Sequence, residues 1–384
     1  MHAKSGLRVV LEWIDLSPGL GDRCRYAPIE MMRMATMLFT IFVACSYCIA
    51  QETPQRLGSL QPVAKTTVNG VKAMVISESQ NSLLISDGTI LPKDSNDLEL
   101  LALSNLKRTA SFKVTDEMSK RYPWSSRSLA LSPNGSSLLL YNQFIDLTTM
   151  QTRASLKIWP VVGRPNVSPE PWSISPNGER ALVLVSSYWS SDESTAAIFD
   201  LKTGESVEKL EIGKAIASGS ACFLDDDTVV SVGRDGTVKL YHLKLDKTEV
   251  LSQKTSQHPN PEGKNLRLTP FDNGKKLLVS GYKEVYVLDM EERKMLYRWK
   301  VYQANAMLTS DEKLILWQTY RLVSKTKSTE YLLLVANVEN GKIVAEFRLP
   351  TFYRMLEIDD TSEFIYGAHN KELHKLKINL NELR

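Results

Sequence analysis

The strongest constraint on the fold is a short pattern that recurs seven times between residues 76 and 358. In each copy an apolar, β-prone stretch runs into a turn rich in Ser, Pro, Asn, Asp and Gly, as in WSISPNG at 172–178. The apolar residues directly before these turns are Ile76, Leu131, Ile174, Leu224, Leu268, Leu308 and Ile358. Their spacings are 55, 43, 50, 44, 40 and 50 residues, so the chain contains seven copies of one structural unit.

The composition of each unit indicates antiparallel strands. Residues 221–243 contain three apolar runs, separated by an acidic turn at 225–227 and by a Gly-Arg-Asp-Gly turn at 233–236. Short β-rich runs between Asp and Gly turns are typical of a meander. A four-stranded propeller blade takes about 40–50 residues, whereas solenoid repeats of about 20–35 residues do not fill these gaps. The spacing therefore predicts an all-β, seven-bladed β-propeller of four-stranded antiparallel blades.

Residues 221–243 resemble three strands of a propeller blade of the WD40 or YVTN type, and the other units repeat them. The Asp-Leu-Lys-Thr-Gly stretch at 200–204 is similar to the turn that joins third and fourth strands in such propellers. No unit carries the Gly-His and Trp-Asp pairs of true WD40 repeats, since Tyr241 and His242 take the Trp-Asp place. The resemblance is therefore closer to YVTN-repeat and quinoprotein-like propellers. It covers about residues 60–384 and implies the seven-bladed fold without the WD40 hydrogen-bonded tetrad.

The last unit indicates how the ring closes. It provides three strands, at about 355–358, 364–366 and 373–378. A further β-prone stretch at 60–68 precedes the first unit and has no blade of its own. We expect this N-terminal strand to pair with the last blade, because joining the two ends leaves no unpaired sheet edge between them.

One segment differs from the rest of the chain in composition. Residues 34–50 are seventeen residues without a charge, preceded by Arg33 and followed by polar chain from Gln51. A basic stretch, an apolar stretch and small residues around Ala50 form the layout of a secretory signal. A retained membrane anchor is the alternative, although this stretch is short for one. We expect a cleaved signal and a mature chain that begins at or near Gln51.

This interpretation divides the chain into an overcalled start or extended n-region at 1–33, a signal peptide or anchor at 34–50, a spacer at 51–59 and the propeller at 60–384. It predicts a secreted or periplasmic protein, with a membrane-anchored form as the alternative. Of four cysteines only Cys222 follows the leader, so the mature chain forms no intramolecular disulfide. Cys222 lies in an apolar inner-strand pattern and is expected to be buried and chemically quiet.

Charge and ligand spacing argue against nucleic acid and metal ions as partners. The formal net charge is +3, with both signs spread along the chain. His369 and His374 lie five residues apart on a turn and a strand, and we expect ordinary surface histidines there. The acidic turns at 225–227 and 359–360 suit either a cation or, as we favour, solvated turn residues. We expect no cofactor.

Catalytic motifs are weak. The chain has no Gly-x-Ser-x-Gly sequence, which a serine hydrolase of the α/β type requires. Ser104 and Lys107 match Ser-x-x-Lys, but they lie in a turn between a third and a fourth strand. A propeller enzyme of the lactonase or quinoprotein-dehydrogenase type needs convergent carboxylates, histidines or a cofactor at the central channel. The sequence does not assemble such a set.

The long connections of the chain point to one face of the propeller. Fourth-to-first and second-to-third connections share what we call the long-connection face, and the other turns share the short-turn face. Every long excursion belongs to the first group: 87–97, 115–127, 160–171, 189–194, 252–265 and 321–329. These connections carry aromatic and basic residues, the types enriched at binding hot spots. The candidate ligand-binding residues are Tyr122, Trp124, Arg127, Trp189, Arg321 and Lys325.

The sequence thus favours a non-catalytic, extracytoplasmic interaction module or scaffold that binds a protein, peptide or glycan on its long-connection face. We expect a monomer, no nucleic-acid partner, and contact with a membrane only if the leader is retained as an anchor. The alternative is a propeller enzyme of the lactonase or quinoprotein-dehydrogenase type, since a fold alone does not imply a function. Three or more His, Asp, Glu or Arg side chains converging on the channel mouth would favour the enzyme, and a channel lined by apolar and small residues would favour the binding module.

Overall fold

The computed structural model describes most of the chain from Pro54 onward. The described residues are 54–68, 71, 73–86, 98–112, 129–158, 167–187, 194–211, 220–233, 237–252, 266–281, 284–301, 306–323 and 328–383. Within these ranges no helix is long and apolar enough to cross a membrane. The leader expected at 34–50 lies outside the described residues, and so do five candidate binding residues: Tyr122, Trp124, Arg127, Trp189 and Lys325.

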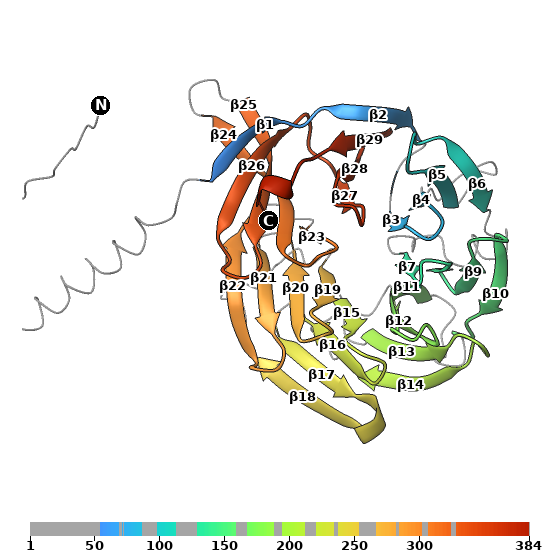
Figure 1. Ribbon diagram of the computed structural model, residues 1–384. Coiled ribbons are helices and arrows are strands. Elements are labelled where there is room, and N and C mark those ends of the chain that lie inside the picture. Colours follow the sequence, from blue (N-terminus) through green and yellow to red (C-terminus); the bar gives the residue numbers. More distant parts are fainter. Residues whose placement is uncertain are drawn as a thin grey trace, which may run out of the picture. The chain divides into compact units, whose positions relative to one another are not determined.

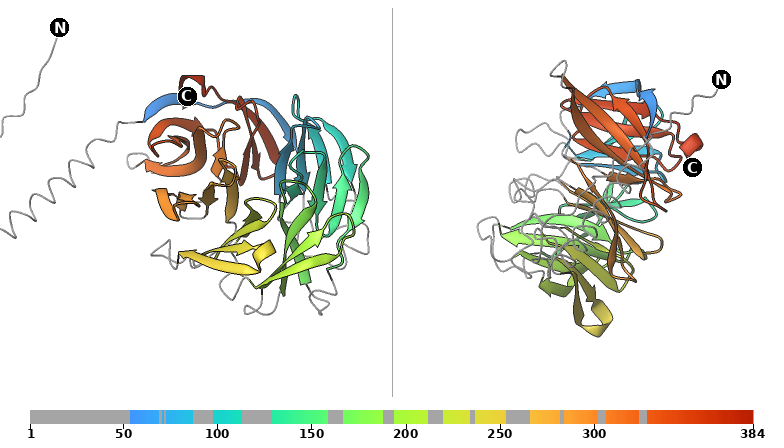
Figure 2. Two further views of the ribbon diagram at one scale, coloured as in Figure 1. Left: turned by 60° about the horizontal axis from the view of Figure 1, so that its bottom comes forward. Right: turned by 90° about the vertical axis from the view of Figure 1, so that its left-hand side faces the viewer.

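Seven sheets, each with four antiparallel strands, follow one another around a ring, which Figure 1 shows from one end and Figure 2 from two other directions. Blade 1 is β3 (Ala73–Ser77), β4 (Ser82–Ser86), β5 (Leu98–Ala102) and β6 (Arg108–Phe112). Blade 2 is β7 (Ala130–Leu131), β8 (Ser137–Leu140), β9 (Gln143–Asp146) and β10 (Gln151–Ser155). Blade 3 is β11 (Val167–Ile174), β12 (Arg180–Ser187), β13 (Ser194–Asp200) and β14 (Ser206–Glu211). Blade 4 is β15 (Ser220–Phe223), β16 (Thr228–Val232), β17 (Val238–His242) and β18 (Lys247–Ser252).

The remaining blades complete the ring. Blade 5 is β19 (Arg267–Phe271), β20 (Lys276–Ser280), β21 (Glu284–Asp289) and β22 (Lys294–Lys300). Blade 6 is β23 (Ala306–Leu308), β24 (Leu314–Val323), β25 (Ser328–Asn337) and β26 (Ile343–Leu349), with β1 (Gln55–Ser59) as a fifth strand. Blade 7 is β27 (Met355–Ile358), β28 (Phe364–His369), β29 (Glu372–Lys377) and β2 (Pro62–Thr67). Two short 3-10 helices, η2 (Leu243–Leu245) and η3 (Asn381–Leu383), are the described helical elements.

The recurring turns mark the blades as the sequence predicts. The seven apolar residues that precede the turns lie in the innermost strands or directly after them, from Ile76 in β3 to Ile358 in β27. The all-β, seven-bladed propeller is therefore confirmed.

The core consists of seven apolar clusters, one at each boundary between neighbouring blades. Second and third strands are covered on both faces, which explains unbroken apolar runs such as Leu138, Leu139 and Leu140, all fully buried. Cys222 lies in the cluster between blades 4 and 5, as expected, and burial raises the pKa of its thiol.

The turn at 200–204 shows how one blade is attached to the next on the outside of the ring. The Asp200 carboxylate accepts the backbone N–H groups of Lys202 and Thr203, at 3.0 and 2.7 Å. Gly204 has a φ of +71°, and a Cβ atom there would lie 2.3 Å from the backbone oxygen of Ser155 in blade 2. Only glycine therefore fits a turn that packs this closely against the neighbouring blade.

The N-terminal strand closes the ring as expected. β2 pairs antiparallel with β29 and supplies the fourth strand of blade 7, with Pro62 opposite Leu376 and Thr67 opposite Glu372. Because β2 precedes blade 1 in the chain, the last blade contains strands from both ends of the propeller.

The stretch at 51–59, expected to be a spacer, contains a strand. β1 pairs parallel with β26 on the outer edge of blade 6, with Arg56 opposite Glu346. The pairing shifts register between Arg56 and Ser59, and Gly58 there has a φ of +93°. The N-terminal segment therefore joins blades 6 and 7 in succession, an arrangement that no local sequence pattern indicates.

Candidate functional site

Blade 6 carries the longest hairpin in the described part of the propeller. β24 and β25 are ten residues each, but β23 pairs only with Ile315, Leu316 and Trp317 of β24. The remaining part of the hairpin lies at the margin of the ring in Figure 1. The expectation of a loop at 321–329 is wrong in its extent, because β24 continues to Val323 and β25 begins at Ser328. The predicted loop at 160–171 is likewise shortened, since β11 begins at Val167. Val323, Thr329 and Val167 in the added strand segments are β-branched residues, which favour the strand.

An apolar surface lies where this hairpin meets the connection between blades 6 and 7. Leu322 near the hairpin tip is 70% exposed, the second-largest exposure among the described large hydrophobic residues. Tyr331 of β25 packs against Phe352 of the β26–β27 connection, with ring centroids 5.9 Å apart. We call Leu322, Tyr331 and Phe352 the hairpin corner. Both segments belong to the long-connection face, so the corner is a described part of the face on which the sequence predicts binding.

A buried glutamine holds the connection that carries Phe352. The Gln318 side chain is fully buried in β24. Its Nε2 donates to the Tyr353 carbonyl oxygen at 2.7 Å, and its Oε1 accepts the Tyr353 N–H at 2.8 Å. Because a single amide satisfies both backbone groups of Tyr353, it fixes that residue as an adjacent strand would.

Two histidines also form hydrogen bonds with the connection that carries Phe352 and Tyr353. His369 Nδ1 donates to the Phe352 carbonyl oxygen at 2.7 Å. His374 is not the surface residue that we expected, because Tyr353 and neighbouring core residues leave it only 7% exposed. Its Nε2 donates to the Glu372 carboxylate at 3.0 Å, so Nδ1 is left to accept the Tyr353 hydroxyl at 2.8 Å. Tyr353 is thus held at its backbone and at its hydroxyl.

Arg321 is the one candidate binding residue that the structure describes, and it lies within a strand. Its Nη2 donates to Glu330 on β25 at 2.7 Å and lies 3.5 Å from Glu346 on β26. Glu330 also forms an ion pair with Arg348, with its carboxylate 2.7 Å from Nε, and Glu346 forms one with Arg56 at 3.1 Å. We call these five residues the arginine ladder. The Arg321 guanidinium lowers the pKa of Glu330, and Glu330 in turn raises the pKa of Arg321.

An ion pair joins two innermost strands that are not neighbours. Arg267 of β19 in blade 5 donates to both carboxylate oxygens of Glu357 of β27 in blade 7, at 2.7 and 3.0 Å. The carboxylate raises the pKa of Arg267. No motif in the sequence links these two positions, which are ninety residues apart, so the pair was not predicted. This pair brings together two charged side chains, fewer than the three or more that would favour the enzyme alternative.

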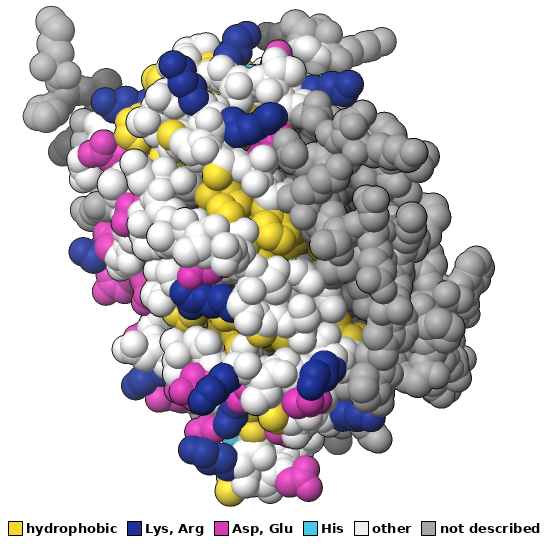
Figure 3. Space-filling model, turned by 90° about the vertical axis from the view of Figure 1, so that its right-hand side faces the viewer, with side chains coloured by type: hydrophobic (Ala, Val, Ile, Leu, Met, Phe, Trp, Pro, Cys, Tyr) yellow, Lys and Arg dark blue, Asp and Glu magenta, His cyan; other side chains and the backbone are white. Residues whose placement is uncertain are grey.

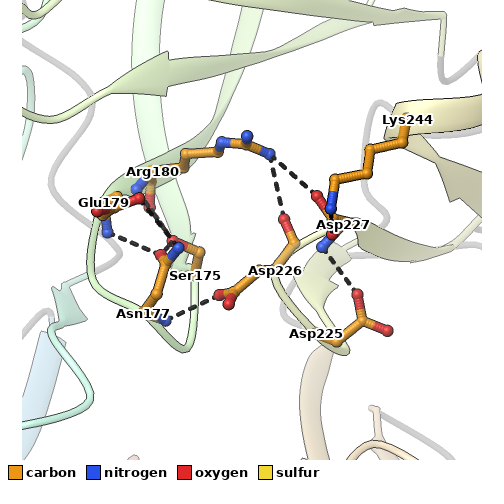
Figure 4. A network of polar contacts seen from close by, with 8 residues as sticks. All are labelled: Ser175, Asn177, Glu179, Arg180, Asp225, Asp226, Asp227 and Lys244. Carbon is orange, nitrogen blue, oxygen red and sulfur yellow. Dashed lines mark hydrogen bonds and ion pairs between the residues drawn. The ribbon is translucent and has the colours of Figure 1, made fainter.

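On the short-turn face, acidic side chains connect the first turns of neighbouring blades. The Asn177 N–H in blade 3 donates to Asp226 Oδ1 in blade 4 at 2.8 Å (Figure 4). Arg180 Nη1 lies 3.2 Å from the Asp226 carbonyl oxygen, and Asp227 pairs with Lys244 at 2.6 Å. The acidic turn at 225–227, which we favoured as solvated, is therefore engaged with blade 3.

The same connection occurs at two further boundaries. The Asp272 N–H in blade 5 donates to Glu312 of blade 6 at 2.8 Å, and the Asp360 N–H in blade 7 donates to Glu78 of blade 1 at 2.9 Å. In all three cases the backbone donor belongs to one blade and the carboxylate to the blade that follows it around the ring. Within the described ranges no group of three or more Cys, His, Asp or Glu side chains could hold a metal ion.

Glu78 makes the boundary between blades 7 and 1 sensitive to pH. Burial raises its pKa, and the nearby Asp359 and Asp360 carboxylates add to the rise against the opposing Asp360 N–H. The folded chain therefore binds the proton of the Glu78 carboxyl group more tightly than the unfolded chain does. The associated stability is complete below the ordinary glutamic acid pKa and is lost as the pH rises through the raised value.

We expect Glu78→Gln to melt at pH 7 at the same temperature as the parent or higher. Glutamine still accepts the Asp360 N–H but carries no charge beside the two aspartates. Melting curves between pH 4 and 7 should show that the variant lacks the gain in stability that the parent acquires on acidification through this window. Asp146→Asn is the matched control. Backbone N–H donors lower the pKa of Asp146, so its contribution to stability is lost on acidification, whereas that of Glu78 is gained. A lower melting temperature of Glu78→Gln at pH 7 would contradict the assignment.

Comparison with known proteins identifies the fold of this chain but not its family. No family model matches the chain, and no curated protein sequence matches it. Similar solved structures include U3-55K, at 8% identity and a TM-score of 0.60 over 83% of this chain and 100% of that chain. The WD40 repeats of RRP9 match at 8% identity and a TM-score of 0.60 over 84% of this chain and 100% of theirs. The likeness confirms the WD40-like propeller architecture, and at this identity it shows the fold alone.

Proposed function

We propose that this propeller is a non-catalytic interaction scaffold that binds a protein, peptide or glycan on its long-connection face, outside the cytoplasm. The observation that carries the proposal is the hairpin corner. Leu322, which is 70% exposed, lies on the same face of the hairpin as Tyr331. Tyr331 packs against Phe352, and Gln318 holds the backbone of the next residue, Tyr353. The leader at 34–50 supports the extracytoplasmic setting.

The corner has the properties of a preorganised binding surface. The Gln318 amide holds both backbone groups of Tyr353, and the His369 ring holds the carbonyl group of Phe352. Little conformational entropy is then lost when a ligand contacts the aromatic ring. Exposed apolar and aromatic groups on a rigid frame are the usual anchors of an interface, each contributing about 2 kcal/mol or more. The candidate residues Trp124 and Trp189 belong to the same face by sequence position and would extend the surface.

The test begins with a ligand recovered by affinity capture from extracellular or envelope material. We expect Leu322→Ser and Phe352→Ala to weaken binding of that ligand about tenfold or more without lowering the melting temperature. Trp124→Ala and Trp189→Ala should act in the same direction. Binding is followed by titration calorimetry, and melting is followed by circular dichroism.

Leu245→Ser is the matched control. Leu245 is 72% exposed on η2, in a third-to-fourth connection on the short-turn face. The substitution Leu245→Ser therefore removes an equally exposed leucine from the opposite face of the propeller. We expect it to leave binding unchanged. If Leu245→Ser abolishes binding while Leu322→Ser does not, the ligand site is on the short-turn face and the proposal fails.

A further inference from the structure

The arginine ladder is an alternating chain of charges that ends on a cation at both sides. The order of contacts is Arg56, Glu346, Arg321, Glu330 and Arg348, drawn from strands β1, β26, β24 and β25. Three guanidinium groups share two carboxylates, so the ladder carries one net positive charge. Each end of such a chain attracts a further anion.

The positive groups of the ladder are also the exposed ones. The side chains of Arg56, Arg321 and Arg348 are 67%, 39% and 59% exposed, whereas Glu330 and Glu346 are 19% and 14% exposed. The carboxylates therefore lie under the guanidinium groups and orient them. On the flank that Figure 3 shows, by contrast, basic and acidic side chains are interspersed at the surface.

The two end arginines keep donors available. In the described part of the chain, Arg56 and Arg348 each contact the ladder through Nε. A guanidinium group has five N–H donors, and its two Nη groups form a fork that matches a carboxylate. Nε is the atom of each end arginine nearest the ladder, and side chains that are 67% and 59% exposed leave the Nη groups accessible to a ligand.

Strand geometry sets the spacing between the two ends. Glu346 and Arg348 are alternate residues on one face of β26, and Arg56 lies opposite Glu346 on the adjacent β1. Alternate residues of a strand are about 6.7 Å apart and adjacent strands about 4.8 Å apart, which separates the two end arginines by roughly 8 Å at the backbone. Acidic side chains at alternate positions of an extended peptide have a comparable spacing.

We propose that the arginine ladder is a second docking surface, on the flank of blade 6, for an extended segment of a partner protein that carries acidic side chains at alternate positions. Two carboxylates of this partner segment pair with Arg56 and Arg348, and so extend the alternating chain of charges at both ends. This surface is distinct from the hairpin corner and does not depend on what binds there.

The experiment uses the full chain and two synthetic nine-residue peptides that differ only in having Glu or Gln at alternate positions. We expect the Glu peptide to bind at least tenfold more tightly at low salt, with an affinity that falls as salt rises. Arg348→Gln and Arg56→Gln should each weaken the Glu peptide about fivefold to tenfold. Glu330→Gln adds a net positive charge to the ladder and should bind the Glu peptide at least as tightly as the parent.

Arg153→Gln is the matched control, because Arg153 is 52% exposed and ion-paired to Asp146 in blade 2. We expect it to leave peptide binding unchanged. Equal binding of the two peptides, or an equal loss in Arg153→Gln, would overturn the proposal. So would a single-stranded polynucleotide or phosphatidylserine vesicles that bind more tightly than the Glu peptide and displace it. Melting temperatures of all variants separate a lost site from a lost fold.

Discussion

Removal of residues 54–68 is expected to destabilise the whole propeller cooperatively and not one blade alone. β2 supplies the outer strand of blade 7, and its loss exposes the backbone edge of β29. Leu60 and Val68, which are 6% and 5% exposed, leave the core at the same time. Two such side chains contribute about 1.5–3 kcal/mol each, and the lost strand pairing adds to this. The sum is on the order of 5 kcal/mol, a large part of the stability of a typical domain.

Denaturant unfolding of the chain begun at Pro54 and of the chain begun at residue 69 measures this effect. Two point variants in the same segment leave the strand in place and separate the loss of a buried side chain from the loss of an exposed one. Leu60→Ala should cost about 2–4 kcal/mol, whereas Val63→Ala should cost less than about 0.5 kcal/mol because Val63 is 55% exposed. A truncated chain with the midpoint of the parent would show that β2 does not close the ring.

Gln318→Ala is expected to destabilise the boundary between blades 6 and 7 strongly, although the residue it replaces is polar. It removes the only described partner of the Tyr353 N–H and the Tyr353 carbonyl group, both of which are buried. Each buried group left unsatisfied costs about 1–3 kcal/mol, so we expect a loss of about 2–5 kcal/mol in the free energy of unfolding. The connection that carries Phe352 should also become mobile, which hydrogen exchange of residues near 350–354 will detect.

Gln143→Ala is the matched control for this substitution, because the Gln143 side chain makes its hydrogen bonds at the exposed surface of blade 2. We expect less than about 0.5 kcal/mol for this variant. If Gln318→Ala and Gln143→Ala have equal effects on stability and exchange, the amide of Gln318 does not hold the connection. In that event the hairpin corner loses its support, and the proposed binding surface would be flexible before a ligand arrives.

The two surfaces proposed on blade 6 share one origin. The hairpin of β24 and β25 is longer than its neighbours, so one side of it meets the connection to blade 7 while the other carries Arg321 and Glu330. β1 then adds Arg56 to this second side. Successive residues of a strand point to opposite faces, which is why a single hairpin presents an apolar surface and a charged one.

The sequence by itself determined the number of blades, the position of each first turn and the pairing of the N-terminal strand with the last blade. These features depend on local chemistry that repeats along the chain, namely β-prone apolar runs and turns that need Pro, Gly or Asp. The tertiary structure decided which side chains meet. Asp226 with Asn177, Glu78 with Asp360, and Arg267 with Glu357 are pairs from different blades. The strand at Gln55–Ser59 and the place of Arg321 in the ladder also became clear only in three dimensions. A repeat fixes what each blade looks like, but the polar contacts between blades named above join residues from 40 to 282 positions apart, through side chains that differ from one blade to the next.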